Sequence, residues 1–243
     1  MMLGGEAELY RPRAGSLSKA SEAIGGTKDA SWLVASARPS PIHPKLFAVP
    51  SFYDLAETEN RLLVSWLLGY VTVDMPFYLA KLLHSEMVQT HYDRVLIDAP
   101  PRLSAACIQA LCASTHLMIP TVMDQLSTEA VTTFLVEVER LKNGNLCPYI
   151  KYGGVIGSML PGGNTQYYRP ATNALRDQLK YAKIQVEVLP EACWIKDLPA
   201  LGRAAGQTIG ILQGSANDKK EIREAFNPLV EEVVRIAPMN RMR

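Results

Sequence analysis

The chain has 243 residues, of which 48% are hydrophobic and 20% are charged, and its formal net charge at pH 7 is +1. A chain of this length and composition can bury a sizeable hydrophobic core, which excludes the disordered and fibrous classes of protein. The small net charge provides no strong overall field, so it argues neither for nor against a nucleic-acid partner.

Cysteine usage and the hydropathy pattern both favour a cytoplasmic protein. The four cysteines, at positions 107, 112, 147 and 193, form no C-x-x-C pair and have no histidine at metal-ligand spacing, so we expect reduced thiols. The most apolar run, residues 62–73, ends at Asp74 and Pro76, well short of the ~20 residues that a membrane span needs. The amino terminus has no basic segment followed by an apolar block, so no secretion signal is expected.

In chain order, residues 1–44 are rich in Gly, Ser, Pro and Ala, and we expect an irregular, flexible arm with a short helix at Ser16–Ile24. Residues 45–243 are expected to form one α/β domain. The expected strands are residues 45–49, 94–97, 116–120, 152–160 and 185–189. The expected helices are one opened by a capping box of Ser51 and Asp54, then 76–90, 103–111, 126–142, 165–181 and 219–236. This alternation predicts a mainly parallel sheet flanked by helices.

The segment YDRVLIDAPP, residues 92–101, is the first candidate for chemistry. A short apolar strand, Arg94–Ile97, is expected to end at Asp98, which two prolines follow after Ala99. An aspartate at the carboxyl end of a buried strand points into the crevice where α/β sheets bind ligands, and in phosphate-handling folds it holds Mg²⁺ or its water. The alternative is an ordinary strand end, because Asp and Pro both mark turns.

Motifs on both sides of Asp98 occur in a series. They are GSLSKA (15–20), LFAVPSFYDLAETE (46–59), DAPP (98–101), QAL (109–111), IP (119–120), TEA (128–130), VLP (188–190) and IKDLPALGR (195–203). In order and spacing they resemble the ParA/Soj/MinD family of partition ATPases, and the likeness runs from about Gly15 to Ile236.

The resemblance implies a P-loop-NTPase-like fold of the ParA/MinD type, with ATP and Mg²⁺ as cofactors. It implies ATP-dependent plasmid or chromosome partition by a dimer that uses nonspecific DNA and a centromere-binding adaptor protein. Asp98 would be the catalytic residue and would place Mg²⁺ through water, while Pro100, Pro101 and Pro190 would lie against the nucleotide. For Pro190 the alternative is a simple strand stop.

The family's phosphate loop, K-G-G-x-G-K-T, has no counterpart in the 243 residues. Such a loop cradles phosphates with successive backbone N–H groups while a lysine reaches them. Gly25-Gly26-Thr27-Lys28 has similar residue types in the wrong order and follows no apolar strand, so we expect a turn that ends a helix. Where the family has D-x-D-P-Q-G, this chain has YRPRAG at 10–15. The chain thus looks like a truncated family member in which the amino-terminal strand–P-loop–helix–strand unit is missing.

Two hypotheses about function follow. In one, the chain belongs to an ATP-dependent partition ATPase whose recorded start is too late, and the 243 residues alone neither bind nor hydrolyse ATP. In the other, the chain is a non-catalytic dimerisation or binding module that modulates an intact partition ATPase; a decayed reading frame is a third possibility. Glu191 and Trp194 replace basic residues of the family's P-R-N-V-R segment, which weakens both nucleotide and DNA binding. Basic residues near the carboxyl end indicate either a solvated helix face or a phosphate-backbone contact.

Overall fold

The computed structural model describes residues 16–40, 43–100, 102–160, 165–204 and 214–238, which fall into two compact units. Unit 2 comprises the described residues up to Ser114, and unit 1 comprises those from Thr115 onward. Each unit has its own hydrophobic clusters, and each is described by itself.

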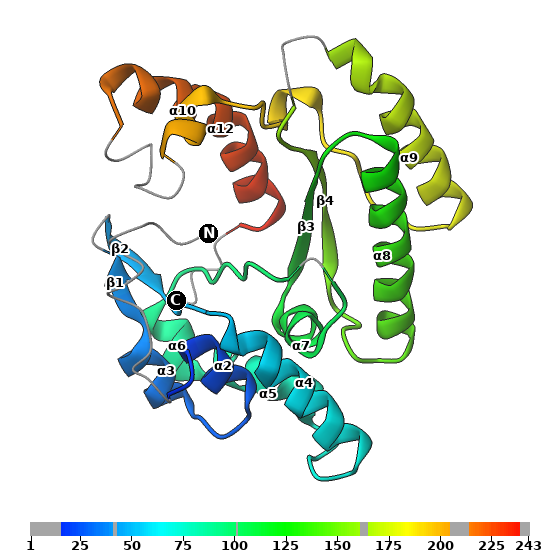
Figure 1. Ribbon diagram of the computed structural model, residues 1–243. Helices are drawn as coiled ribbons and strands as arrows, with labels where there is room; N and C mark the ends of the chain where they lie inside the picture. The colour runs from blue at the N-terminus through cyan, green and yellow to red at the C-terminus, as the bar shows by residue number, and fades with distance from the viewer. Residues whose placement is uncertain (1–15, 41–42, 101, 161–164, 205–213, 239–243) are drawn as a thin grey trace. The chain divides into compact units, whose positions relative to one another are not determined.

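Unit 2 consists of short helices and one β-hairpin (Figure 1). Its elements are α2 (Lys19–Ile24), α3 (Ala30–Ser36), β1 (Arg38–Ser40), β2 (His43–Ala48), α4 (Asp54–Leu67), η1 (Met75–Phe77), α5 (Tyr78–Leu83), α6 (Glu86–His91) and α7 (Ala105–Ala113). Strands β1 and β2 pair antiparallel. One cluster, around Leu33, Leu82 and Val88, joins α3, α5 and α6, and a second, around Ile24, Leu62 and Ala106, joins α2, α4 and α7.

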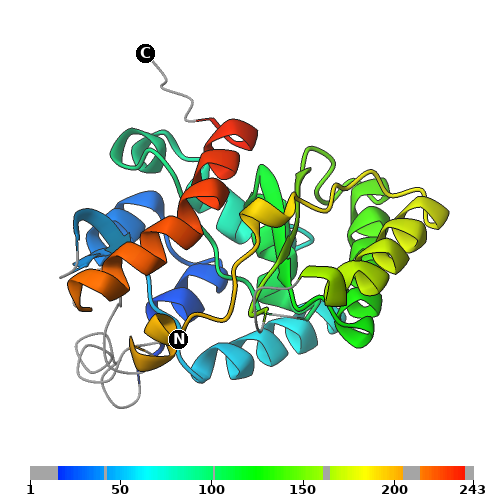
Figure 2. The same cartoon turned by 90° about the horizontal axis from the view of Figure 1, so that it is seen from above.

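Unit 1 is an α/β layer built around a parallel strand pair. Its elements are β3 (His116–Thr121), α8 (Gln125–Asn143), β4 (Lys151–Gly157), η2 (Thr165–Tyr168), α9 (Arg169–Tyr181), η3 (Glu191–Cys193), α10 (Pro199–Ala204) and α12 (Ala216–Ile236). Strands β3 and β4 pair parallel, and Val188 extends the layer through a parallel bridge to Val155. Helices α8 and α9 lie on one side of the strands and α12 on the other (Figures 1 and 2).

Alternation along β3 explains these two layers. Ile119 belongs to the main core with Leu135 of α8 and Leu175 of α9, whereas Met118 packs in a second cluster with Leu229 and Ile236 of α12. Successive side chains of a strand point to opposite faces, so a strand with apolar residues on both faces becomes covered on both sides. The predicted α/β class with a parallel sheet and flanking helices is confirmed.

Several predicted elements differ in detail. The expected helix 76–90 is divided into η1, α5 and α6, since Ser85 caps α6 by accepting a hydrogen bond from the Val88 N–H. The capping box of Ser51 and Asp54 is wrong, because Tyr53 is the N-cap of α4 and provides no side-chain bond. The expected strand 185–189 forms only the Val188 bridge. Within residues 16–44, α3 and β1 were not predicted.

Candidate functional site

The segment that carries Asp98 is irregular, so the predicted strand Arg94–Ile97 is wrong. In the described part of unit 2, β1 and β2 pair only with each other and no strand pairs with this segment. A strand requires hydrogen-bonding partners on a neighbouring strand. Leu96 is 83% exposed. Asp98 is exposed and Pro100 is partly buried, while Pro101 lies outside the described residues.

The chain just after the Asp98 segment is held by Glu59, a buried carboxylate on α4 that is 4% exposed. Glu59 accepts hydrogen bonds from Arg102 Nη2 at 2.9 Å, from the Ala106 N–H at 3.1 Å and from the Ser104 hydroxyl. Ser104 is also the N-cap of α7 and accepts from the Cys107 N–H. A carboxylate at a helix amino terminus satisfies N–H groups that lack partners within the helix and interacts favourably with the helix dipole. Glu59 therefore fixes both the start of α7 and the end of the Asp98 segment.

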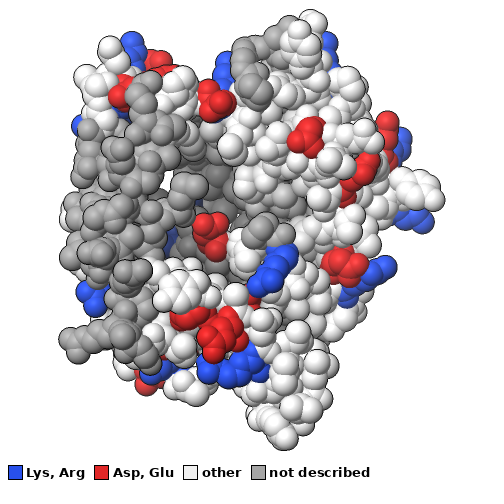
Figure 3. Space-filling view, in the orientation of Figure 1, with Lys and Arg blue, Asp and Glu red and all other residues white. Residues whose placement is uncertain are grey.

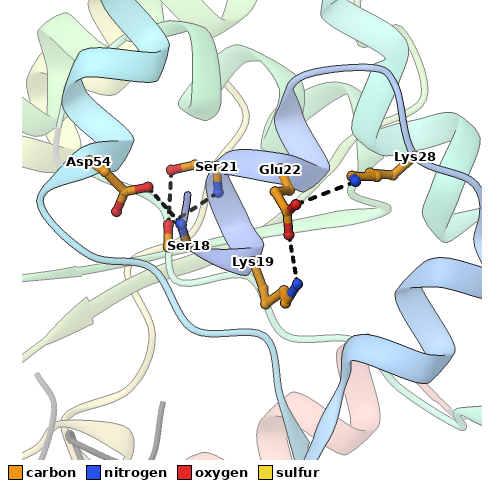
Figure 4. Close-up of polar contacts among 6 residues, drawn as sticks. All are labelled: Ser18, Lys19, Ser21, Glu22, Lys28 and Asp54. Carbon is orange, nitrogen blue, oxygen red and sulfur yellow. Dashed lines mark hydrogen bonds and ion pairs between the residues drawn. The ribbon is translucent and has the colours of Figure 1, made fainter. Parts of the chain in front are cut away.

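Asp54 belongs to the same motif as Glu59, LFAVPSFYDLAETE, and it holds the start of α2 (Figure 4). The Ser18 N–H donates to Asp54 Oδ2 at 2.7 Å, and the Ser18 hydroxyl lies 2.9 Å from that of Ser21. Burial opposes ionisation of Asp54, but the hydrogen bonds from Ser18, Ser21 and its own backbone outweigh it, so its pKa is lowered. From the sequence, Asp54 was expected in a capping box with Ser51, and Glu59 was given no role. In the structure, Asp54 and Glu59 link segments that are distant in the chain.

The Gly25-Gly26-Thr27-Lys28 stretch forms a turn after α2, as predicted. Gly25 is the C-cap of α2, and Gly26 has φ +76°, a conformation that side chains rarely adopt. Lys28 Nζ is 3.3 Å from Glu22, which also pairs with Lys19 at 2.8 Å (Figure 4). Burial raises the pKa of Glu22, but the hydrogen bonds and charges of the two lysines outweigh this effect and lower it. Lys28 thus neutralises a local carboxylate in a turn that is no phosphate loop.

Pro190 belongs to unit 1, where it ends the Val188 segment and precedes η3. Its side chain is exposed, and its carbonyl accepts a hydrogen bond from the Cys193 N–H at 2.8 Å. Trp194 is buried, donates from Nε1 to the Leu189 carbonyl at 2.8 Å, and packs over Gly157 so closely that a Cβ there would be 2.7 Å from its ring. Trp194 is therefore a core residue, which explains how it can occupy a position that is basic in the family.

The described residues do not fit a Mg²⁺–nucleotide group. Within the described ranges, no group of three or more His, Cys, Asp or Glu side chains is arranged to hold a metal ion. The sequence supplies no G-x-x-x-x-G-K-[ST] loop, and Asp98 is exposed on an irregular segment. Asp98 belongs to unit 2 and Pro190 to unit 1.

On the face shown in Figure 3, the acidic and basic side chains of the described residues are interspersed. On α12, Arg235 pairs with Glu232, and Lys220 lies 3.8 Å from Glu224. Such pairing is typical of a solvated helix face, the first of the two interpretations of this basic cluster.

Among the described helices, none has both the length and the apolar character needed to cross a bilayer. All four cysteines are free thiols.

Sequence comparisons give a consistent family. A family model described as an AAA domain matches residues 36–148. The chromosome-partitioning ATPase Soj of Treponema pallidum is 31% identical over 122 residues, covering 50% of this chain and 44% of that protein. The Soj of Thermus thermophilus is 27% identical over 143 residues, covering 59% of this chain and 53% of that protein. The chain thus spans about half the length of these relatives.

Solved structures show the same fold at low sequence identity. Apo McdA of Cyanothece has a TM-score of 0.69 and 19% identity, over 93% of this chain and 81% of that one. Cobyrinic acid a,c-diamide synthase of Mycobacterium smegmatis, with bound ADP and magnesium, has a TM-score of 0.61 and 19% identity, over 90% of this chain and 78% of that one. The chain is therefore similar in sequence to the chromosome-partitioning ATPase Soj and alike in fold to McdA.

Proposed function

We propose that the protein acts in plasmid or chromosome partition, and that its 243 residues by themselves neither bind nor hydrolyse ATP. The observation that carries this proposal is the state of Asp98, an exposed carboxylate on an irregular segment. A polyphosphate needs a nest of backbone N–H groups and a cation to offset its desolvation, and a lone carboxylate repels it. ATP and Mg²⁺ remain the cofactors that the family suggests, with Asp98, Pro100, Pro101 and Pro190 as the positions that would meet them in an intact site.

A second candidate is a non-catalytic dimerisation or binding module that modulates an intact partition ATPase. The hydrogen bonds of Glu59 and Asp54 favour it, because they preserve the scaffold around α2, α4 and α7 independently of any phosphate loop. In this role the partners would be a second copy of the chain or an intact ParA-like ATPase, in the cytoplasm. A centromere-binding adaptor protein and nonspecific DNA are the further partners that the family suggests.

Calorimetry with ATP and Mg²⁺ tests the first proposal. We expect no heat of binding up to millimolar nucleotide, and no phosphate release by the wild type, by Asp98→Ala or by the matched control Asp93→Ala. Asp93 is an exposed aspartate in the same stretch of chain. Turnover that depends on Mg²⁺ and is lost in Asp98→Ala but retained in Asp93→Ala would refute the proposal.

The second candidate requires an effect on another protein. We expect the chain, added to an intact Soj-type ATPase, to change the rate of phosphate release in proportion to its concentration. Glu59→Gln should weaken this effect if the scaffold around α7 forms the contact, whereas Glu57→Gln, an exposed change on the same helix, should leave it intact. An unchanged rate at all concentrations would eliminate the modulating role.

A further inference from the structure

Unit 1 contains an open groove of about 530 Å³ between the second half of α9 and the segment that returns from it, residues 183–188. The turn between them is fixed by Lys183, whose φ is +58°, and by the Ile184 N–H, which donates to the Leu179 carbonyl at 2.9 Å. The floor is apolar and consists of the buried side chains of Leu179, Ile184 and Val188. Its volume lies within the range of ligand sites in proteins, about 300–1,000 Å³.

One wall of the groove is the edge of the sheet. The Val155 N–H donates to the Glu187 carbonyl at 2.8 Å, and the Leu189 N–H donates to the Val155 carbonyl at 2.9 Å, so the backbone groups of residues 187 and 189 face β4. Backbone groups alternate in direction along a strand, which turns the Val186 carbonyl and the N–H and carbonyl of Val188 to the opposite edge. The Val186 N–H is already used, because it donates to the Ile184 carbonyl at 3.1 Å. In the part of unit 1 that the structure describes, no strand pairs with that edge.

The other wall is basic. Arg176 and Lys180 lie one turn apart on α9, Lys183 follows at the turn, and all three are exposed and line the groove. None of the three has an ion pair with another described residue. Glu187 also borders the groove, but Val186 and Val188 pack into the α8–α9 core, so alternation directs Glu187 to the α12 face. There its charge adds to that of Glu232 in raising the pKa of Arg235.

We infer that this groove binds an extended acidic peptide, which adds a strand beside residues 186–188 and sets its acidic side chains against Arg176, Lys180 and Lys183. Strand addition uses backbone hydrogen bonds for affinity and alternate side chains for specificity. Every second side chain of the peptide would face α9 and the three cations. The apolar floor and the free sheet edge favour a peptide over a nucleic acid, because a phosphate backbone can use neither.

Fluorescence anisotropy with a labelled peptide of alternating glutamate and valine tests this site on the full chain. We expect saturable binding that weakens about tenfold in the triple variant Arg176→Gln, Lys180→Gln, Lys183→Asn, since each exposed charge pair contributes a factor of a few. Asparagine at position 183 tolerates the left-handed backbone there. The matched control is Lys151→Gln, Lys196→Gln, Arg223→Gln, which removes the same charge from exposed positions of the same unit and should retain binding.

A second readout separates strand addition from charge attraction without altering the protein. Two peptides are N-methylated on alternate residues, one set on the glutamates and the other on the valines. A strand that pairs through one edge loses binding with one set and keeps it with the other. Equal binding of both methylated peptides, an equal loss in the control variant, or tighter groove-dependent binding of a single-stranded oligonucleotide of matched charge would each overturn the inference.

Discussion

At the scale of single residues, Glu59 determines where the Asp98 segment ends. Its ion pair with Arg102 contributes little by itself, because the Arg102 side chain is 59% exposed and solvent screens the pair. The bond from the Ala106 N–H is buried and the bond from the Ser104 hydroxyl is partly buried, and both donors would lose a charged acceptor if Glu59 were neutral. Glu59 thus acts mainly as an internal acceptor that orders the start of α7.

We expect Glu59→Gln to lower the free energy of unfolding by about 2 kcal/mol, because hydrogen bonds to a charged group each contribute about 1.5–3 kcal/mol and the amide replaces them only in part. Glu57→Gln on the same helix is exposed and should change the stability by less than about 0.5 kcal/mol. Urea denaturation of the two variants gives the comparison. Equal stabilities would show that Glu59 is not an anchor.

Asp54 should make stability depend on pH in the acid range. Its pKa in the folded protein is depressed below the ordinary 3.8, so its stabilising contribution is complete above that value and is lost as the pH falls through the folded pKa. Asp54→Asn should therefore be less stable than the wild type at neutral pH, with the difference shrinking below about pH 4. Thermal unfolding across this range measures it, and a difference that is constant with pH would contradict the assignment.

At the scale of elements, β4 depends on glycine at the point where the Val188 segment approaches it. Gly154 has φ +125°, and a Cβ there would lie 2.7 Å from Leu189 and 3.1 Å from the Glu187 carbonyl. The register of β3 and β4 shifts between Leu117 and Met118, beside this residue. The glycine therefore permits both the irregular register and the close approach of the returning chain.

Gly154→Ala should destabilise unit 1 by more than about 2 kcal/mol, because the new methyl group adds overpacking to an unfavourable backbone conformation. Ser158→Ala, just beyond the same strand, serves as a control and should have a small effect. Denaturation followed by fluorescence in a background of Trp32→Phe and Trp66→Phe, where Trp194, buried in unit 1, is the remaining tryptophan, reports on the change. If Gly154→Ala matched its control, the close approach would not be needed for folding.

The sequence predicted most elements but not their pairing. Periodicity located α8, α9 and α12 to within a few residues, because each buries a stripe at helical spacing. It failed at Arg94–Ile97, since a strand is defined by its neighbour and the apolar run carries no information on whether that neighbour is present. The roles of Glu59 and Asp54 were also hidden, because their partners lie 36 to 47 residues away and no local pattern links them.

At the scale of the whole molecule, the division into two units was not visible in composition or spacing, because the boundary between α7 and β3 contains no run of Gly, Pro or charge. The family model nevertheless matches across this boundary, over residues 36–148. The similarity in sequence therefore extends across both units, whereas each hydrophobic cluster lies within one unit.

Unit 2 also exposes an apolar surface where α4 ends, which we call the α4 tip. In Figure 1 this end of α4 extends away from the other helices of unit 2. The exposed members of the α4 tip are Leu63, Val64, Trp66, Leu67, Leu68, Tyr70 and Val73. Exposed apolar patches of this kind drive association between copies of a chain unless a partner covers them.

We expect the protein to self-associate as its concentration rises, and the double variant Leu67→Lys, Leu68→Lys to remain monomeric over the same range. Both leucines are more than half exposed, so charge at these positions keeps the tip in water without removing buried contacts. The control Asn60→Lys, Gln89→Lys adds the same charge at exposed polar positions of unit 2 and should associate like the wild type. Sedimentation velocity distinguishes the three proteins. A wild type that stays monomeric, or a control that behaves like the leucine variant, would show that the α4 tip does not drive association.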